Sequence, residues 1–138
     1  MTAAATGAVF TWLGMVTAIS FLETPLKFRA PGVTVRIGLG IGRLVFRALN
    51  TAEAILGAVL VVAAVTQPPP PRVIAAGAVA ITTLLVQVAV VRPWLTRRSD
   101  RVLAGEDLPR SPGHYAYVGL ELIKVTALLV TGVLLLAR

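Results

Sequence analysis

The sequence predicts an all-α integral membrane protein with four transmembrane helices in an antiparallel bundle. Hydrophobic residues make up 57 % of the 138 residues and charged residues only 14 %, whereas a soluble domain carries about 25 % charged residues. Four long apolar stretches fill most of the chain, and the hydrocarbon core of a bilayer requires about 20 apolar residues in a helix. Once four spans are drawn, no room is left for a second domain, so we expect one domain over residues 1–138.

Each expected helix is built around a stretch without charged residues. Thr2–Leu22 and Val73–Val91 are the cores of the first and third helices, and Ala54–Val65 and Val125–Ala137 belong to the second and fourth. We expect the first stretch to be a retained helix rather than a signal peptide, because no Lys or Arg precedes it. The expected helices span about 5–26, 44–66, 73–95 and 114–137.

Proline and glycine mark the connections, because proline lacks a donor N–H and interrupts helical pairing. The segment Val33–Gly42 is either an interfacial helix or the first turns of a long second helix, and its Gly38/Gly42 pair has the spacing that permits close helix packing. The residues expected to end or separate helices are Pro25, Pro31, Gly32, Pro68–Pro71, Pro109, Pro112 and Gly113.

The basic residues are strongly biased toward one side of the predicted bundle. The two loops after the first and third helices, with their flanks, hold ten Lys or Arg residues, against Arg72 and Arg138 on the other side. Because positive loops stay in the cytoplasm, we expect a plasma-membrane protein with both termini outside. This position also explains the net charge of +7 without a nucleic-acid partner. The bases expected to contact lipid headgroups or set topology are Lys27, Arg29, Arg36, Arg43, Arg47, Arg97 and Arg98.

Polar residues inside the expected spans form the candidate site. Charged side chains cost about 2.5–3.5 kcal/mol each at a helix centre, so they indicate function by default. Alternating helix directions place them all in the cytoplasmic half, where they predict a polar pocket for a small solute. The candidate substrate-binding residues are Glu23, Asn50, Glu53, His114, Tyr117, Glu121 and Lys124.

Two readings without a solute remain open. Glu121 and Lys124 are three residues apart and can neutralise each other, and Glu53 can pair with Arg47 or Lys124, so these charges can simply fix the order of the helices. Alternatively, they contact another subunit. The function is therefore binding or passage of a small solute, or a non-catalytic assembly or stabilising role in a larger complex. Short spans rich in Gly and Ala also favour a homo-oligomer or a complex subunit.

Residues for catalysis and cofactor binding are missing. The chain has no cysteine and one histidine, which removes thiolate chemistry and multi-histidine metal sites. Phosphate-loop, dinucleotide, His-Glu-x-x-His and Gly-x-Ser-x-Gly motifs do not occur. We expect neither an enzyme nor a cofactor or metal.

Three segments resemble the transmembrane protein 205 family of small four-helix membrane proteins. They are FLETPLKFRAPGV after the first helix, RPWLTRRSDRVLAGE after the third, and HYAYVGLE at the start of the fourth. Pro31, Pro93 and His114 match family positions, whereas the shorter loop after the third helix and the Glu121/Lys124 pair depart from them. The resemblance implies four helices and a loose link to export or drug resistance. Small multidrug exporters have a glutamate within the first helix, where this chain has no acid before Glu23.

Overall fold

The fold is all-helical in the computed structural model, which describes residues 2–105 and 112–137. The described residues form four long helices, two of which contain a π-helical segment. All four are long and apolar enough to cross a membrane, as expected for a multi-pass membrane protein. The first long helix is α1 (Thr2–Val16), η1 (Thr17–Glu23) and α2 (Thr24–Lys27); the second is α3 (Val35–Thr66); the third is α4 (Pro71–Val86), η2 (Gln87–Val91) and α5 (Arg92–Leu103); the fourth is α6 (Pro112–Leu136).

The second and third long helices extend beyond the expected bounds. Most of the segment 33–42 forms the first turns of α3, which begins at Val35, and the Thr34 hydroxyl caps this helix by accepting a 3.1 Å hydrogen bond from the backbone N–H of Ile37. The third helix continues past residue 95 to Leu103, where α5 is tied to α3 by polar contacts. Arg36 donates to the carbonyl of Leu103, and Arg43 forms an ion pair with Asp100.

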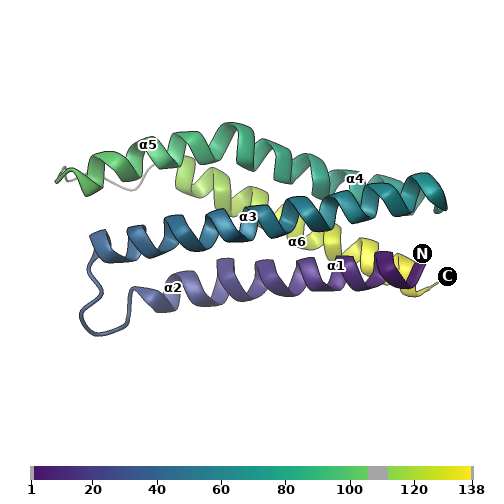
Figure 1. Ribbon diagram of the computed structural model, residues 1–138, viewed down its shortest axis with the longest axis horizontal. Helices are drawn as coiled ribbons and strands as arrows, with labels where there is room; N and C mark the ends of the chain where they lie inside the picture. Colours follow the sequence, from purple (N-terminus) through teal and green to yellow (C-terminus); the bar gives the residue numbers. More distant parts are fainter. Residues whose placement is uncertain (1, 106–111, 138) are drawn as a thin grey trace.

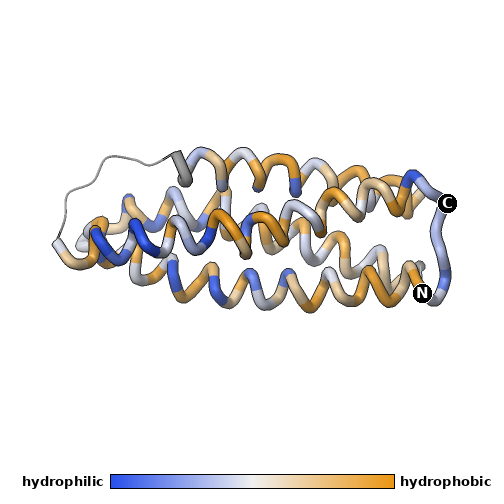
Figure 2. The backbone as a smooth tube through the Cα atoms, turned by 90° about the horizontal axis from the view of Figure 1, so that it is seen from above, coloured by the Kyte–Doolittle hydropathy of each residue, from blue (hydrophilic) through white to orange (hydrophobic). Residues whose placement is uncertain are grey.

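Figure 1 shows the four long helices running side by side, with both chain ends at the same end of the bundle. α6 packs on α1 and α4, α1 also packs on α3, and α3 contacts α4, so the helices close into a ring. In Figure 2 the hydrophilic residues gather mainly in the half farther from the chain ends. This half carries α2, the start of α3, and α5. We call it the basic end, because these segments hold basic residues such as Lys27, Arg36, Arg43, Arg97 and Arg98.

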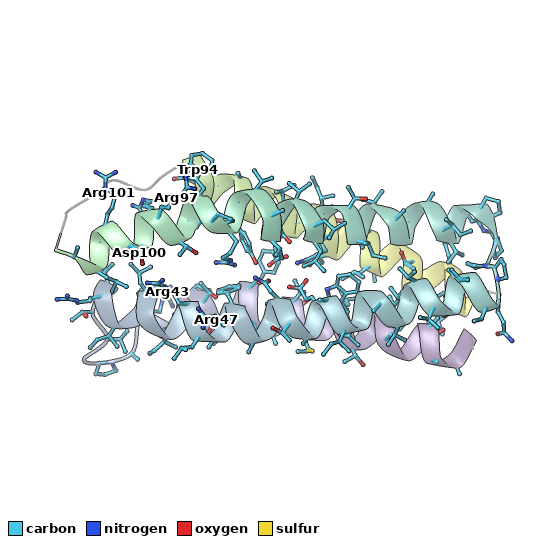
Figure 3. The ribbon with its side chains drawn as sticks, turned by 45° about the horizontal axis from the view of Figure 1, so that its top comes forward. Arg43, Arg47, Trp94, Arg97, Asp100 and Arg101 are labelled. Carbon is cyan, nitrogen blue, oxygen red and sulfur yellow. The ribbon has the colours of Figure 1, made fainter. Side chains whose placement is uncertain are left out.

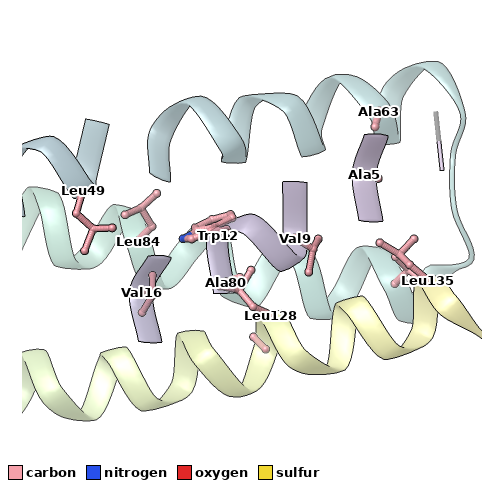
Figure 4. Packing of buried hydrophobic residues seen from close by; sticks show 12 residues of the cluster. Ala5, Val9, Trp12, Val16, Leu49, Ala63, Ala80, Leu84, Leu128 and Leu135 are labelled. Atoms are coloured by element: carbon pink, nitrogen blue, oxygen red, sulfur yellow. The ribbon is translucent and has the colours of Figure 1, made fainter. Parts of the chain in front are cut away.

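The apolar core lies in the middle of the bundle and at the end near the termini (Figure 4). Trp12 is fully buried there, together with Val9, Val16 and Leu128. Small residues make room for the larger ones, as is usual where membrane helices approach closely. A Cβ atom on Gly57 would lie 3.7 Å from the Trp12 ring, in ordinary contact.

Gly38 and Gly42 accommodate side chains of the preceding turn rather than a second helix backbone. A Cβ atom on Gly38 would overlap the ring of Phe28, and one on Gly42 would lie 3.2 Å from Nζ of Lys27. The pair therefore seats the end of α2 against the beginning of α3.

Candidate functional site

A buried ion network lies where the apolar core meets the basic end. Lys124 is 0 % exposed, and its Nζ contacts Oε2 of Glu53 and, at 2.6 Å, Oε1 of Glu121. The same ammonium donates a 2.8 Å hydrogen bond to Oε1 of Gln87. All three of its donors thus have acceptors, as a buried lysine requires.

Uncharged side chains complete this network from the other helices. The Trp12 indole donates to Oε2 of Glu53 at 2.7 Å, and the Ser20 hydroxyl donates to Oε2 of Glu121 at 2.6 Å. Gln87 donates a longer 3.3 Å bond to Oε1 of Glu121. The polar contacts therefore join all four long helices at one level of the bundle.

Two residues of the network lie in the π-helical segments. Ser20 belongs to η1 and Gln87 to η2, and each segment ends two residues before a proline, Pro25 or Pro93. A proline cannot donate to the carbonyl four residues earlier, and its ring crowds that carbonyl. At both places the N–H just before the proline bonds five residues back, which widens the turn. Such π segments occur often at functional sites.

A cavity of about 760 Å³ lies at the basic end, next to the network. Its walls come from η1 and α2, the first three turns of α3, α5, and the first turns of α6. Glu121 and Ser20 lie at its boundary with the network. Among the described residues that line it, five are basic and only Glu121 is acidic; the basic ones are Lys27, Arg29, Arg43, Arg92 and Arg98. The cavity therefore favours anions.

Arg92 occupies a distinctive position in this lining. Its guanidinium carbon lies 4.8 Å from the ring centre of Phe46 and 4.6 Å from that of Tyr117, and the two rings meet edge to face at 5.8 Å. Nε and Nη2 of Arg92 are buried, as is the Tyr117 hydroxyl, and none of these groups has a hydrogen-bond partner among the described residues. Orphaned buried donors are uncommon and require an explanation.

Two other bases of the lining already have acidic partners. Lys27 lies 3.7 Å from Glu23, and Arg43 lies 2.6 Å from Asp100. Figure 3 shows Arg43 and Asp100 facing one another between α3 and α5. Because Lys27 and Arg43 are already paired with acids, they compete less with the other bases of the lining for a ligand in the cavity.

The structure divides the predicted substrate-binding residues between the network and the cavity. Glu53 and Lys124 belong to the closed network, Tyr117 lines the cavity, and Glu121 belongs to both. Two others contribute to neither set of contacts: Glu23 pairs with Lys27, and the buried Oδ1 of Asn50 has no hydrogen-bond partner among the described residues. The side chain of His114 lies outside the described part of the chain.

The bases predicted to contact headgroups are divided in the same way. Arg36, Arg47 and Arg97 are exposed on the helices of the basic end. The others line the cavity, namely Lys27, Arg29, Arg43 and Arg98.

Sequence reasoning missed four residues of the site: Trp12, Ser20, Gln87 and Arg92. Trp12 has no charge and lies in a long apolar stretch, and Arg92 is one of the ten bases of the two positive loops and their flanks, so the sequence distinguishes neither as a site residue. Of the four, only Gln87 could be identified from the sequence, because a lone amide inside a 19-residue run without charges needs a buried hydrogen-bond partner. Ser20 has no such signal, since serine can bond the backbone of its own helix.

No family model, curated protein or solved structure matches this chain. The resemblance to the transmembrane protein 205 family stays a prediction, and the site must be interpreted from its own chemistry.

The chemistry available at this site is that of binding. The described residues contain no group of three His, Cys, Asp or Glu side chains that could hold a metal ion. Both oxygens of Glu121 are bonded, to Lys124 and Ser20, whereas Glu53 bonds Lys124 and Trp12 through Oε2 and its buried Oε1 has no hydrogen-bond partner among the described residues. The lining of the cavity, in contrast, contains buried donors without a hydrogen-bond partner among the described residues and an excess of positive charge.

Proposed function

We propose that this protein binds a small solute in the cavity at the basic end, on the cytoplasmic side of the plasma membrane. The observation that carries this proposal is the cavity itself: about 760 Å³ lies within the range of 300–1,000 Å³ that small-molecule sites occupy. It is lined by convergent polar groups, including buried donors that have no partner among the residues that the structure describes.

The proposed orientation rests on the distribution of charge. Lys27, Arg29, Arg43 and Arg98 surround the cavity, and segments rich in such residues remain on the cytoplasmic side. The solute would therefore enter from the cytoplasm, and both termini would lie outside. Passage across the membrane would require the ion network beside the cavity to open.

A variant that narrows the cavity tests the proposal. Gly42 lines the cavity, and only the flexible end of Lys27 lies near a Cβ built on it, whereas Gly40 is outside the lining and has open space around it. Wild type, Gly42→Leu and the matched control Gly40→Leu would be purified in mild detergent. Small molecules extracted from each would be compared by mass spectrometry.

We expect a solute that accompanies the wild type and Gly40→Leu and is depleted from Gly42→Leu. The same extract from all three proteins, or no enriched molecule in any, rejects the proposal.

A non-catalytic assembly or stabilising role is the second candidate. The network favours it, because Lys124 and Glu53 are fully buried, form an ion pair and join helices rather than line the cavity. In that case Glu53→Gln should reduce association with partner proteins, while Gly42→Leu should leave this association unchanged. Solute retention and partner recovery from the same membranes therefore separate the two functions.

A further inference from the structure

We propose that Arg92 and Tyr117 form the seat for an anionic group, a carboxylate or a phosphate, of the ligand that occupies the basic-end cavity. This inference rests on the proposed function and specifies the chemical class of its ligand.

The unused donors of Arg92 are the two that bind an oxyanion together. Nε and Nη2 lie on the same edge of the guanidinium plane, and both are buried without a partner among the described residues. Two parallel N–H groups on one edge match the two oxygens of a carboxylate or phosphate, which is the bidentate geometry in which arginine binds most strongly. The Tyr117 hydroxyl, which lies beside the Arg92 guanidinium and belongs to the same lining, supplies a further donor.

The aromatic rings hold this edge in place. Phe46 and Tyr117 lie 4.8 Å and 4.6 Å from the guanidinium carbon, and rings in such positions attract a cation through their faces. Arg92 therefore needs no carboxylate to be retained at this position, and its hydrogen-bonding edge stays available. A preorganised donor pair binds with less loss of conformational freedom than a flexible surface arginine.

The acidic side chain of the cavity lining is already bonded to other residues, so an external anion can bind to Arg92 without competing with it. Glu121 is the only acid of the described lining, and its two oxygens are already bonded to Lys124 and Ser20. Lys27 and Arg43 are paired with Glu23 and Asp100. An anion at Arg92 would thus experience the positive field of the lining and satisfy donors that no described residue satisfies.

Two sources can supply such a group: the phosphate of an anionic lipid headgroup, or a free anion from the cytoplasm. The full-length protein would be placed in nanodiscs of pure phosphatidylcholine and titrated calorimetrically with inorganic phosphate and with acetate. A parallel sample would be placed in phosphatidylcholine nanodiscs that contain phosphatidic acid, and retained lipid would be measured by native mass spectrometry. Tetramethylammonium chloride serves as the cationic control.

The informative variants are Arg92→Lys, which keeps the charge but loses the paired donors, and Tyr117→Phe, which removes only the hydroxyl. We expect each to weaken binding of the anion about tenfold. Arg97→Lys is the matched control on the same helix, because Arg97 is exposed and outside the cavity lining, and it should bind as the wild type does. Unfolding midpoints in the same nanodiscs show that each variant is folded.

Binding of phosphate or acetate in pure phosphatidylcholine supports a free anion, and retention of phosphatidic acid alone supports a headgroup. The inference is overturned if no anion binds, or if Arg92→Lys and Tyr117→Phe bind as tightly as Arg97→Lys. A neutral or cationic solute depleted by Gly42→Leu would also overturn it, while the proposed function would survive. If Gly40→Leu and Gly42→Leu both retain the same small molecules as the wild type, the proposed function is rejected, whatever the anion titrations show.

Discussion

Replacement of Lys124 by methionine should destabilise the protein more than replacement of the whole buried ion network. Methionine has a similar length and fits the apolar surroundings, but it leaves the carboxylates of Glu53 and Glu121 without their shared cation. Both carboxylates are almost completely buried, at 0 % and 1 % exposure, so water cannot replace the ammonium. Lys124→Met therefore removes the ammonium group and leaves two buried carboxylates without a counter-ion.

The magnitude follows from the cost of breaking a buried ion pair, which is about 3–5 kcal/mol when one partner is removed. At about 3 °C per kcal/mol, this corresponds to a loss of roughly 10–15 °C in the unfolding midpoint. Lys124→Met with Glu121→Gln still strands Glu53 and should lie between. Adding Glu53→Gln makes every group neutral, and the amide oxygens can still accept from Trp12 and Ser20. Because neutral replacements of buried ion sets are often harmless, the triple variant should recover most of the loss.

Thermal unfolding of the three variants in one detergent, followed by circular dichroism, measures these differences. Fluorescence of the buried Trp12 gives a local signal once the exposed Trp94 is changed to phenylalanine. The expected order of stability is triple, double, single. If the triple variant is as unstable as Lys124→Met, charge stranding is not the cause of the loss, and the description of the network is wrong.

Four further outcomes are expected. Trp12→Phe removes the indole donor of the network and should cost about 1–3 kcal/mol in thermal unfolding; an unchanged midpoint would exclude a role for this hydrogen bond. Ser20→Ala should cost about 1.5–3 kcal/mol, because its hydroxyl bonds a carboxylate, whereas the control Thr17→Ala, whose exposed hydroxyl bonds its own helix, should stay within about 0.5 kcal/mol. In this cysteine-free chain, Ser99→Cys should react with impermeant maleimide only from the cytoplasmic side and Thr66→Cys only from outside, and the opposite pattern refutes the orientation. Mass measurement in mild detergent and in nanodiscs should show more than one copy, and a monomer in both removes the oligomer proposal.

The ionic part of the site could be predicted because it obeys helical geometry. Glu121 and Lys124 are three residues apart, so they lie on one face of a helix, and alternating helix directions bring Glu53 to the same depth. The structure places all three in one network. Their charges are visible in an apolar sequence, since each would be too costly in lipid without a partner.

The anion seat could not be predicted in the same way. The expected third helix ends near residue 95, and Arg92 is one of the ten bases of the two positive loops and their flanks. In the structure a π segment precedes the proline and the helix continues to Leu103, which keeps Arg92 against Phe46 and Tyr117 from two other helices. A contact among three helices depends on their relative rotation, and no spacing within one helix encodes that rotation.

The network lies between the cavity and the apolar core. This position favours binding of a solute from one end of the bundle over an open channel through it. A solute in the cavity meets Glu121, and beyond it Lys124 bonds two carboxylates and Gln87. Farther toward the termini, the interior is closed by Trp12 and the apolar residues around it. Passage would therefore require Lys124 to leave both carboxylates and the core helices to separate, and breaking such buried pairs costs about 3–5 kcal/mol. Glu121 and Ser20 belong to both the cavity and the network, and the backbone carbonyl of Tyr117 accepts a 3.4 Å hydrogen bond from Gln87. An anion held at Arg92 could therefore influence the network through these contacts.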